Sequence, residues 1–573
     1  PHARDAITLD SEHRQAMAAI ARGQAARDAI NARLLDKARA RWPQQWRALA
    51  PLPLRFASWV GYDMDGRTDI SWATSLRYRL SEKAERLAGY AAMLRSAAPD
   101  LAARLDRAGA RAGEMAALFA ADLSDPAALS AAANTLTAEH PDKLTSLSET
   151  IAELETLAAS ADDARAEVLL IAAAAMRADG LGMGWIHFRV NSSQLQNAIR
   201  RRIDPDGTLD LASQAALMRM RELLAEVRPL RSNFAALAIE NSTAVRQFLA
   251  MAQILHHVDG DAPIRMLVAE CEQPTTVLAA LYFARLFGID DKVDVSPLFE
   301  TESALEHGGR FLDALLAEPA YRAYAKTRGR VAVQTGFSDA GRFVGQIPAA
   351  LAIERLQGRL SEAMVANGLG DVAALIFNTH GESMGRGAHP GSFEDRLAWP
   401  LSPWARRRFV RAGIALEPEV SFQGGDGYLF FGTPELALAT LTRFAELAPA
   451  STDPDAPKRR GISYFLMDMR APGIDVRPIR NAVGDSHFCE VFLNDVRIPE
   501  VNLVGAQNAG WQVAQETLGA ERGMTMLELA ERLGNAGLGW LAQACPAGDA
   551  VAADRLAGVD VEPGDRHAGQ QIH

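Results

Sequence analysis

The densest set of chemistry-bearing residues lies in the segment Phe377–Pro390, which holds three glycines, two histidines and one arginine. Glycines let a backbone approach a ligand closely, and an arginine supplies a planar fork for phosphate or carboxylate. The apolar run Val372–Phe377 leads into this segment and predicts a buried strand. A loop of this kind at the end of a buried strand predicts an anion-binding site that includes Gly385, Arg386 and Gly387.

Other polar residues also follow short apolar runs. They are Arg189, Glu300, Asp339, Arg342, Asn378 and His380. In a βα barrel such strand ends meet at one face. Glu300 and Asp339 would then share a hard divalent cation, and Arg189 and Arg386 would attract an anionic substrate. The combination predicts phosphoryl or carboxyl chemistry on a small, highly anionic molecule.

Each of these residues also has a purely structural interpretation. Glu300 alone reads as a solvated loop carboxylate, Asp339 as a helix cap, Arg189 as a rim ion pair and His380 as an ordinary loop histidine. The two loop glycines alone would serve a tight turn. Their joint occurrence on successive strand ends favours the functional interpretation.

The surrounding pattern predicts the elements that position these residues. Residues 1–180 show helical spacing of apolar positions, and long helices are also expected at 212–254 and 345–367. Between them lie apolar runs expected to be strands: 185–190, 264–269, 293–299, 331–337, 372–377 and 417–422. This alternation predicts a mostly helical α/β fold built on a partial (β/α) barrel with large helical additions.

Composition narrows the class of protein. The 573 residues carry a formal net charge of −11, which argues against nucleic acid and anionic membrane as partners. No apolar run approaches the roughly 20 residues that a membrane span requires. The three cysteines form no metal-binding spacing, which fits a reducing cytoplasm. The chain begins with Pro1 rather than Met, so we expect the start to be truncated.

The composition changes near residue 450. Residues 448–457 hold three prolines, and β-rich segments follow at 462–467, 474–479 and 487–493. A helix is expected from about residue 509, with a tail that is disordered or truncated. The expected parts are a helical region (1–180), a partial barrel with the active-site loops (181–447), a junction (448–456), a small β-domain (457–508) and the start of a helical bundle (509–573).

Five segments, in order, make residues 1–450 resemble the phosphoenolpyruvate carboxylase family. The loop 377–390 is similar to its FHGRGG and GRGGGP motifs, and Gly336–Arg342 to its GYSDSGK motif. The remaining matches are Pro297–Thr301, Trp59–Gly66 and His187–Ser192.

The resemblance implies a lyase that carboxylates phosphoenolpyruvate with bicarbonate to oxaloacetate and phosphate, an anaplerotic step feeding the tricarboxylic acid cycle. It implies Mg²⁺ or Mn²⁺ held by Glu300 and Asp339. It also implies a substrate phosphate bound by Arg189, developing charge stabilised by Arg386 and a homo-oligomer. The loop glycines Gly385 and Gly387 would contact the substrate.

Several positions depart from the family pattern. His380 stands in place of the first loop arginine, and Arg342 in place of the lysine after the Ser-Asp pair. Both remain candidate catalytic residues. The family's catalytic His-Pro-Thr strand would precede Pro1, so we expect the truncated chain to have low carboxylase activity.

Residues from about 451 to 573 resemble a fragment of the acyl-CoA dehydrogenase family. The matching segments are Thr452–Met469, Pro472–Ile474, Val476–Ile479, Gly484–Phe492, Asp495–Pro499, Asn502–Gly505 and Glu521–Gly523. That family implies FAD, but no cofactor-binding residue is assigned because the fragment supplies no complete flavin site. Two alternatives therefore stay open: an FAD-dependent acyl-CoA dehydrogenase fragment, and a non-catalytic fusion or assembly remnant of two genes.

Overall fold

The structure is a computed structural model that describes residues 8–51, 54–64, 67, 69–230, 232–336, 340–341, 344–378, 401–422, 430–446 and parts of 463–509. The chain divides into two compact units, Pro1–Ala445 and Glu446–His573. In the described part of the chain, no helix is long and apolar enough to cross a membrane.

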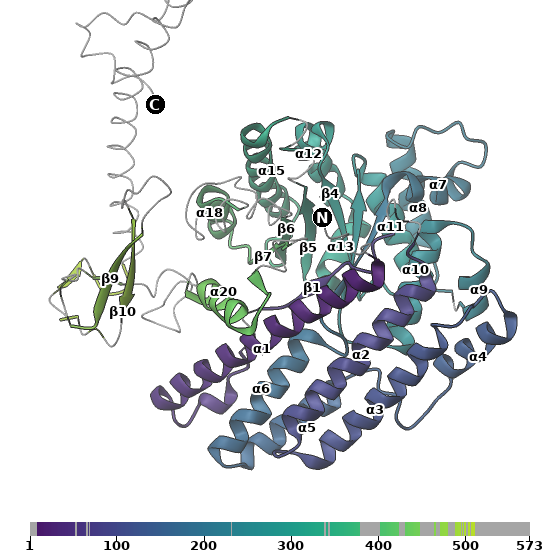
Figure 1. Ribbon diagram of the computed structural model, residues 1–573. Coiled ribbons are helices and arrows are strands. Elements are labelled where there is room, and N and C mark those ends of the chain that lie inside the picture. Colours follow the sequence, from purple (N-terminus) through teal and green to yellow (C-terminus); the bar gives the residue numbers. More distant parts are fainter. Residues whose placement is uncertain are drawn as a thin grey trace, which may run out of the picture. The chain divides into compact units, whose positions relative to one another are not determined.

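The first unit is built on one parallel sheet whose strands follow each other in chain order. They are β1 (Ala57–Ser58), β2 (Trp185–Asn191), β3 (Ile264–Ala269), β4 (Val293–Phe299), β5 (Arg330–Thr335), β6 (Ala373–Asn378) and β7 (Leu416–Val420). The sheet is curled into part of a barrel (Figure 1). The predicted fold class, a mostly helical partial (β/α) barrel, is confirmed.

Helices connect the strands and cover the outside of the sheet (Figure 1). They are α7 (Ser192–Ile203), α8 (Gln214–Glu226), α9 (Phe234–Ile239), α10 (Thr243–His257), α11 (Pro274–Leu286), α12 (Glu302–Leu316), α13 (Pro319–Arg328), α15 (Gln346–Ala366) and α18 (Pro403–Arg411). The prediction of one helix over 212–254 is wrong. The side chains of Asn233 and Ser242 start α9 and α10 as N-caps, which divides this region into three helices.

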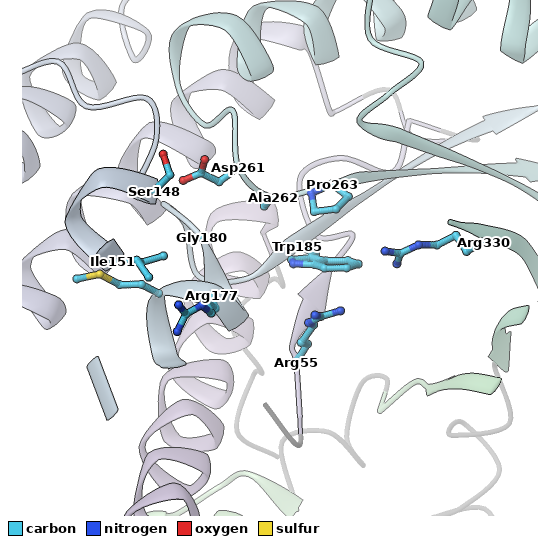
Figure 2. A pocket seen from close by; sticks show the side chains of 11 residues that line it. Arg55, Ser148, Ile151, Arg177, Gly180, Trp185, Asp261, Ala262, Pro263 and Arg330 are labelled. Carbon is cyan, nitrogen blue, oxygen red and sulfur yellow. The ribbon is translucent and has the colours of Figure 1, made fainter. Parts of the chain in front are cut away.

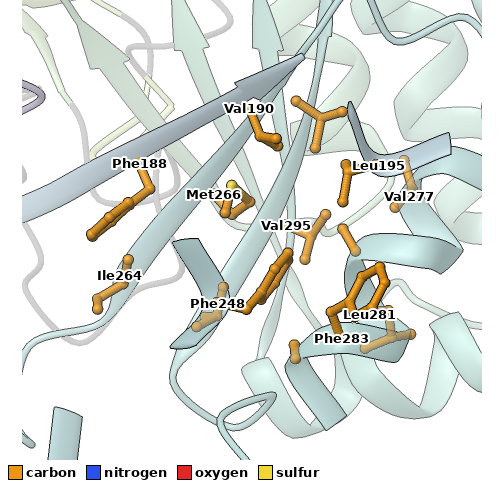
Figure 3. Close-up of a cluster of buried hydrophobic side chains, with 14 of the residues drawn as sticks. Phe188, Val190, Leu195, Phe248, Ile264, Met266, Val277, Leu281, Phe283 and Val295 are labelled. Atoms are coloured by element: carbon orange, nitrogen blue, oxygen red, sulfur yellow. The ribbon is translucent and has the colours of Figure 1, made fainter. Parts of the chain in front are cut away.

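Strand alternation separates an apolar outer face from a polar inner face. Phe188, Val190, Met266 and Val295 point outward and pack against Phe248 of α10 and other helix residues in one buried cluster (Figure 3). The residues between them, such as Arg189, therefore face the interior of the partial barrel.

A second helical layer precedes the barrel. It consists of α1 (Leu9–Arg41), the short 3-10 helix η1 (Trp46–Ala48), α2 (Trp72–Leu94), α3 (Pro99–Leu118), α4 (Pro126–Thr137), α5 (Ser148–Ser160) and α6 (Asp163–Asp179). These helices share a buried apolar cluster of their own. Arg27 and Arg86 both bind the fully buried Asp179, which ties α1 and α2 to the end of α6. One more helix, α20 (Pro434–Glu446), packs its Ala437 and Leu441 with Ile30 of α1.

The second unit contains short antiparallel strand pairs. β9 (Ile474–Ile479) pairs with β10 (Phe488–Leu493), and β8 (Tyr464–Phe465) pairs with β11 (Leu503–Val504). The strands expected at 462–467, 474–479 and 487–493 are therefore present. The predicted junction at 448–456 and the predicted helical bundle lie outside the described residues, apart from Ala509.

Candidate functional site at the carboxyl ends of the strands

Arg189 lies near the carboxyl end of β2 and faces the interior of the partial barrel. Its neighbours in register on the next two strands, Leu267 and Ser296, are both buried. Only 29% of the Arg189 side chain is exposed. The guanidinium thus sits at a partly enclosed face, where the carboxyl ends of parallel strands meet.

Two carboxylates flank this arginine. The Arg189 Nη1 atom lies 4.0 Å from Asp63 Oδ2, and Nη2 lies 3.7 Å from Glu300 Oε2. The backbones of Asp63 and Arg189 also form an isolated parallel β-bridge. Three segments far apart in sequence therefore place one cation between two anions, which is a charge arrangement suited to binding polar or ionic ligands.

The Glu300 carboxylate is held from two sides. Its Oε1 atom accepts a 3.0 Å hydrogen bond from the backbone N–H of Glu270, directly after β3. A Cβ atom added at Gly336, directly after β5, would come within 2.6 Å of the Glu300 Cβ. Only glycine at position 336 therefore leaves room for this placement of the nearly buried glutamate.

Helix α2 positions the loop that carries Asp63. Ser75 Oγ donates a 2.7 Å hydrogen bond to the Gly61 carbonyl oxygen, and the Tyr62 hydroxyl donates one of 2.9 Å to Glu82. Burial and the neighbouring Glu82 raise the pKa of Tyr62, so the phenol remains a donor at neutral pH. The tight turn at Gly61, with φ of 91°, is anchored on both sides.

On the amino-terminal side of Arg189, the inner face of the sheet carries the buried polar residues His187 and Arg265. Arg265 on β3 forms a bidentate pair with Glu419 on β7 at 2.5 and 3.0 Å. His187, next to it in register, is 2% exposed, and neither ring nitrogen has a hydrogen-bond partner among the residues that the structure describes. Burial and Arg265 lower the pKa of His187 well below its ordinary value, although Asp294 opposes them, so the ring is neutral.

The described side chains of this site provide some, but not all, of the ligands that a hard divalent cation requires. Glu300 supplies carboxylate oxygens of the type that Mg²⁺ and Mn²⁺ prefer. Within the described residues, however, no group of three or more His, Cys, Asp or Glu side chains is placed to hold a metal ion. The second predicted ligand, Asp339, lies outside those residues.

Of the predicted site residues, the structure brings Arg189 and Glu300 together. The others lie outside the described residues: Asp339, Arg342, His380, Gly385, Arg386 and Gly387. Asn378 was expected to join the other strand-end residues at one face of the barrel, and it does not. It is fully buried, and its Oδ1 accepts hydrogen bonds from Thr335 and Gln357 of α15, so it faces the helical layer.

Sequence patterns left two positions of this site without a role. Asp63 belongs to a polar loop that is similar to a family motif, but its residue type and spacing indicate no specific role. Glu270 contributes only its backbone N–H, which binds Glu300, and its backbone has a φ of 52°. Such a backbone contact cannot be recognised from the type of residue.

Comparison with known proteins agrees with this architecture. The phosphoenolpyruvate carboxylase family model matches residues 120–401, which include β2 to β6. The chain is 27% identical to a phosphoenolpyruvate carboxylase of Mycobacterium leprae over 413 residues, 65% of this chain and 43% of the relative. It is 34% identical to one from a Thermus species over 155 residues, 26% of this chain and 18% of the relative.

A different relative matches a short stretch. An acyl-CoA dehydrogenase of Mycobacterium tuberculosis is 58% identical over 73 residues, 13% of this chain and 10% of that protein. The chain thus spans less than half the length of each of these three relatives. Residues 120–401 match the phosphoenolpyruvate carboxylase family model, and a separate short stretch is similar to acyl-CoA dehydrogenases.

Proposed function

We propose that the site at the carboxyl ends of the strands carboxylates phosphoenolpyruvate with bicarbonate, forming oxaloacetate and inorganic phosphate. The observation that carries this proposal is the placement of Arg189 beside Glu300, 3.7 Å apart, within the family-matched segment. A cation next to a carboxylate can receive both an anionic substrate and its counter-ion.

The chain's own residues have separate roles in this proposal. Arg189 binds the substrate phosphate through its planar fork of N–H donors. Glu300 and Asp339 would hold Mg²⁺ or Mn²⁺, and the ion would supply positive charge to the anionic substrate. Arg386, which follows β6 in the sequence, stabilises negative charge as it develops on the reacting carbon and carboxyl group.

Asp63 acts as a positioning residue. Its carboxylate lies 4.0 Å from the Arg189 guanidinium, and α2 holds its loop through Ser75 and Glu82. We infer that Asp63 keeps the guanidinium pointed at the substrate side of the barrel, because removing one of two flanking anions would let it turn toward the other.

The direct test measures oxaloacetate formation from phosphoenolpyruvate, bicarbonate and Mg²⁺, followed by coupled reduction to malate. The Glu300→Gln change keeps the acceptor oxygen for the Glu270 N–H but removes the charge, so metal-dependent turnover should fall by at least about 100-fold. Glu306→Gln, an exposed change on α12, is the matched control and should leave turnover unchanged. Equal activity of both variants would contradict the assignment of Glu300.

The setting of this activity is also a proposal. We place the protein in the cytoplasm as a homo-oligomer, in line with its family resemblance. Light scattering of the purified chain would give a mass that is a multiple of 61.8 kDa. A mass of a single chain at micromolar concentration would exclude a stable oligomer.

The short acyl-CoA dehydrogenase-like stretch supports a second candidate. Identity of 58% over 73 residues is a close match, so an FAD-dependent dehydrogenase fragment remains the alternative function. The flavin content of the purified chain distinguishes the two candidates.

A further inference from the structure

The first two turns of α1 reach the loop that places Asp63 beside Arg189. This loop, residues 59–64, connects β1 to the segment before α2. Asp10 and His13 of α1 bind side chains of α2 that in turn contact the loop. A path of direct contacts therefore runs from α1 through α2 to the cation of the candidate site.

Tyr78 of α2 forms the first step of this path. Its ring stacks on the His13 ring, with the ring centres 3.9 Å apart and an interplanar angle of 14°. Its hydroxyl donates a 2.5 Å hydrogen bond to Asp10. A Cβ atom added at Gly61 would lie 2.3 Å from Tyr78 Cδ2, so the loop backbone rests directly on this ring. A movement of Tyr78 would therefore displace the loop two residues before Asp63.

Glu82, about one turn further along α2, forms the second step. Its Oε1 atom accepts hydrogen bonds from the Tyr62 hydroxyl at 2.9 Å and from His13 Nε2 at 3.0 Å, and its Oε2 atom accepts one from Arg79. Burial opposes ionisation, but the hydrogen bond from His13 and the charge of Arg79 lower the pKa of Glu82. All four side chains are buried, so these charge-assisted hydrogen bonds are little weakened by solvent.

The same contacts fix the loop to the strand that carries Arg189. Arg79 Nη1 donates a 2.8 Å hydrogen bond to the carbonyl oxygen of Gly184, directly before β2. The ring centre of Tyr62 lies 5.5 Å from that of Phe188, the residue before Arg189 on β2. Tyr62 is thus held by α2 through its hydroxyl and packs against β2 through its ring.

We propose that His13 and Tyr62 are positioning residues of the site. They hold residues 59–64 so that the Asp63 carboxylate stays 4.0 Å from the Arg189 guanidinium and directs it toward the substrate. This inference rests on the proposed function and adds a further point. The amino-terminal turns of α1 set the affinity for phosphoenolpyruvate through buried side chains that lie behind the site.

The test is calorimetric titration of the full chain with phosphoenolpyruvate in the presence of Mg²⁺. Tyr62→Phe removes one hydroxyl and should weaken binding by about 5- to 10-fold, because the loop position that orients Arg189 becomes less populated. Tyr90→Phe is the matched control. Tyr90 is an equally buried tyrosine of α2, and its hydroxyl donates a 2.9 Å hydrogen bond to the Gly180 carbonyl oxygen. Figure 2 shows Gly180 and Trp185 lining a cavity at the start of β2, the end of that strand away from Arg189, so this variant should bind like the unchanged chain.

Two changes at His13 separate positioning from packing. His13→Phe keeps a ring against Tyr78 but removes the donor to Glu82, so it should weaken binding as much as Tyr62→Phe. His13→Gln loses the stacked ring but retains an amide N–H donor, so it should restore most of the affinity. A role limited to packing predicts the reverse order of the two variants.

A double variant tests whether the effect passes through Asp63. Tyr62→Phe should cause no further loss of binding in an Asp63→Asn chain, because both changes act on Arg189 by the same route. Hydrogen exchange of residues 59–64 in the ligand-free chain should be faster in Tyr62→Phe and unchanged in Tyr90→Phe.

The outcomes distinguish this inference from the function on which it rests. Equal affinities of Tyr62→Phe and Tyr90→Phe, additive losses in the double variant, or unchanged exchange of residues 59–64 would overturn the positioning role. The proposed function would survive those results if Arg189→Gln still weakens binding. Failure of the unchanged chain to bind phosphoenolpyruvate would overturn both.

Discussion

The backbone N–H of Glu270 donates a 3.0 Å hydrogen bond to the carboxylate of Glu300 across the ends of two neighbouring strands. Glu270 reaches this position with φ of 52°, a left-handed conformation that costs most residues about 1 kcal/mol or more. Its own side chain is exposed, so the conformation serves the backbone contact and not the glutamate side chain.

The strained conformation at Glu270 leads to a stability prediction. Glu270→Gly keeps the N–H and relieves the left-handed strain, so the free energy of unfolding should not fall below that of the unchanged chain. Glu270→Val adds a β-branched side chain at the same φ and should lower it by about 1–2 kcal/mol. Urea unfolding curves give both values. A Gly variant less stable than the Val variant would contradict the role of this backbone geometry.

The contact between Gly336 and Glu300 predicts a change in both stability and ligand binding. Gly336→Ala would place a Cβ 2.6 Å from the Glu300 Cβ, so the glutamate must shift, at a cost of about 1–3 kcal/mol. Mg²⁺-dependent binding of phosphoenolpyruvate should weaken in parallel. Gly370→Ala is the matched control, because no atom of the described residues lies within 4 Å of its added Cβ. Similar losses in both variants would indicate a general backbone effect.

Buried His187 predicts a pH dependence of stability. Its pKa is lowered in the folded protein, so the unfolded chain binds one more proton below the ordinary pKa of about 6.5. The stabilisation that neutral His187 provides is fully present above about pH 6.5. As the pH falls below this value, the free energy of unfolding decreases by up to about 1.4 kcal/mol per pH unit.

Urea unfolding between pH 7.5 and about 5 measures this dependence. His187→Phe should flatten the slope, since neither ring nitrogen makes a hydrogen bond to any described residue that the change would break. His307→Gln, an exposed histidine of α12, should keep the slope of the unchanged chain. If His187→Phe retains the full slope, the pH dependence originates elsewhere, for example at His257, whose pKa burial lowers to about 4.

The flavin alternative has a direct spectroscopic test. The matched acyl-CoA dehydrogenase stretch covers 10% of that relative, so we expect the purified chain to bind no stoichiometric flavin. The measurement is the visible absorption spectrum before and after adding FAD and removing the unbound excess. A stable flavin band at one FAD per chain would support the dehydrogenase alternative.

The sequence predicted the barrel strands well because each is a short apolar run bounded by turn residues, as at 264–269 and 293–299. It could not predict β1, since Ala57–Ser58 is too short to show any periodicity. It overextended the helix at 212–254, where the caps Asn233 and Ser242 resemble ordinary polar helix residues.

The proximity of the two candidate residues Arg189 and Glu300 was predictable to a similar extent. Arg189 and Glu300 were identified because both follow strand-like runs, and parallel strands bring such ends together. Asn378 also lies at the end of a strand, but its side chain faces the helices. Neighbouring residues of a strand point to opposite faces, so an error of one residue reverses the expected direction of a side chain. The contribution of Glu270 depends on a backbone angle that residue types do not specify.

The central claim is that Arg189 and Glu300 form a phosphoenolpyruvate site, and calorimetric titration with phosphoenolpyruvate in the presence of Mg²⁺ tests it most directly. Arg189→Gln should weaken binding by about 100-fold or more, because a charged donor to the phosphate is lost. Arg219→Gln, a 57% exposed arginine of α8, should bind like the unchanged chain. Equal affinity of the two variants, or no binding by the unchanged chain, would contradict the account.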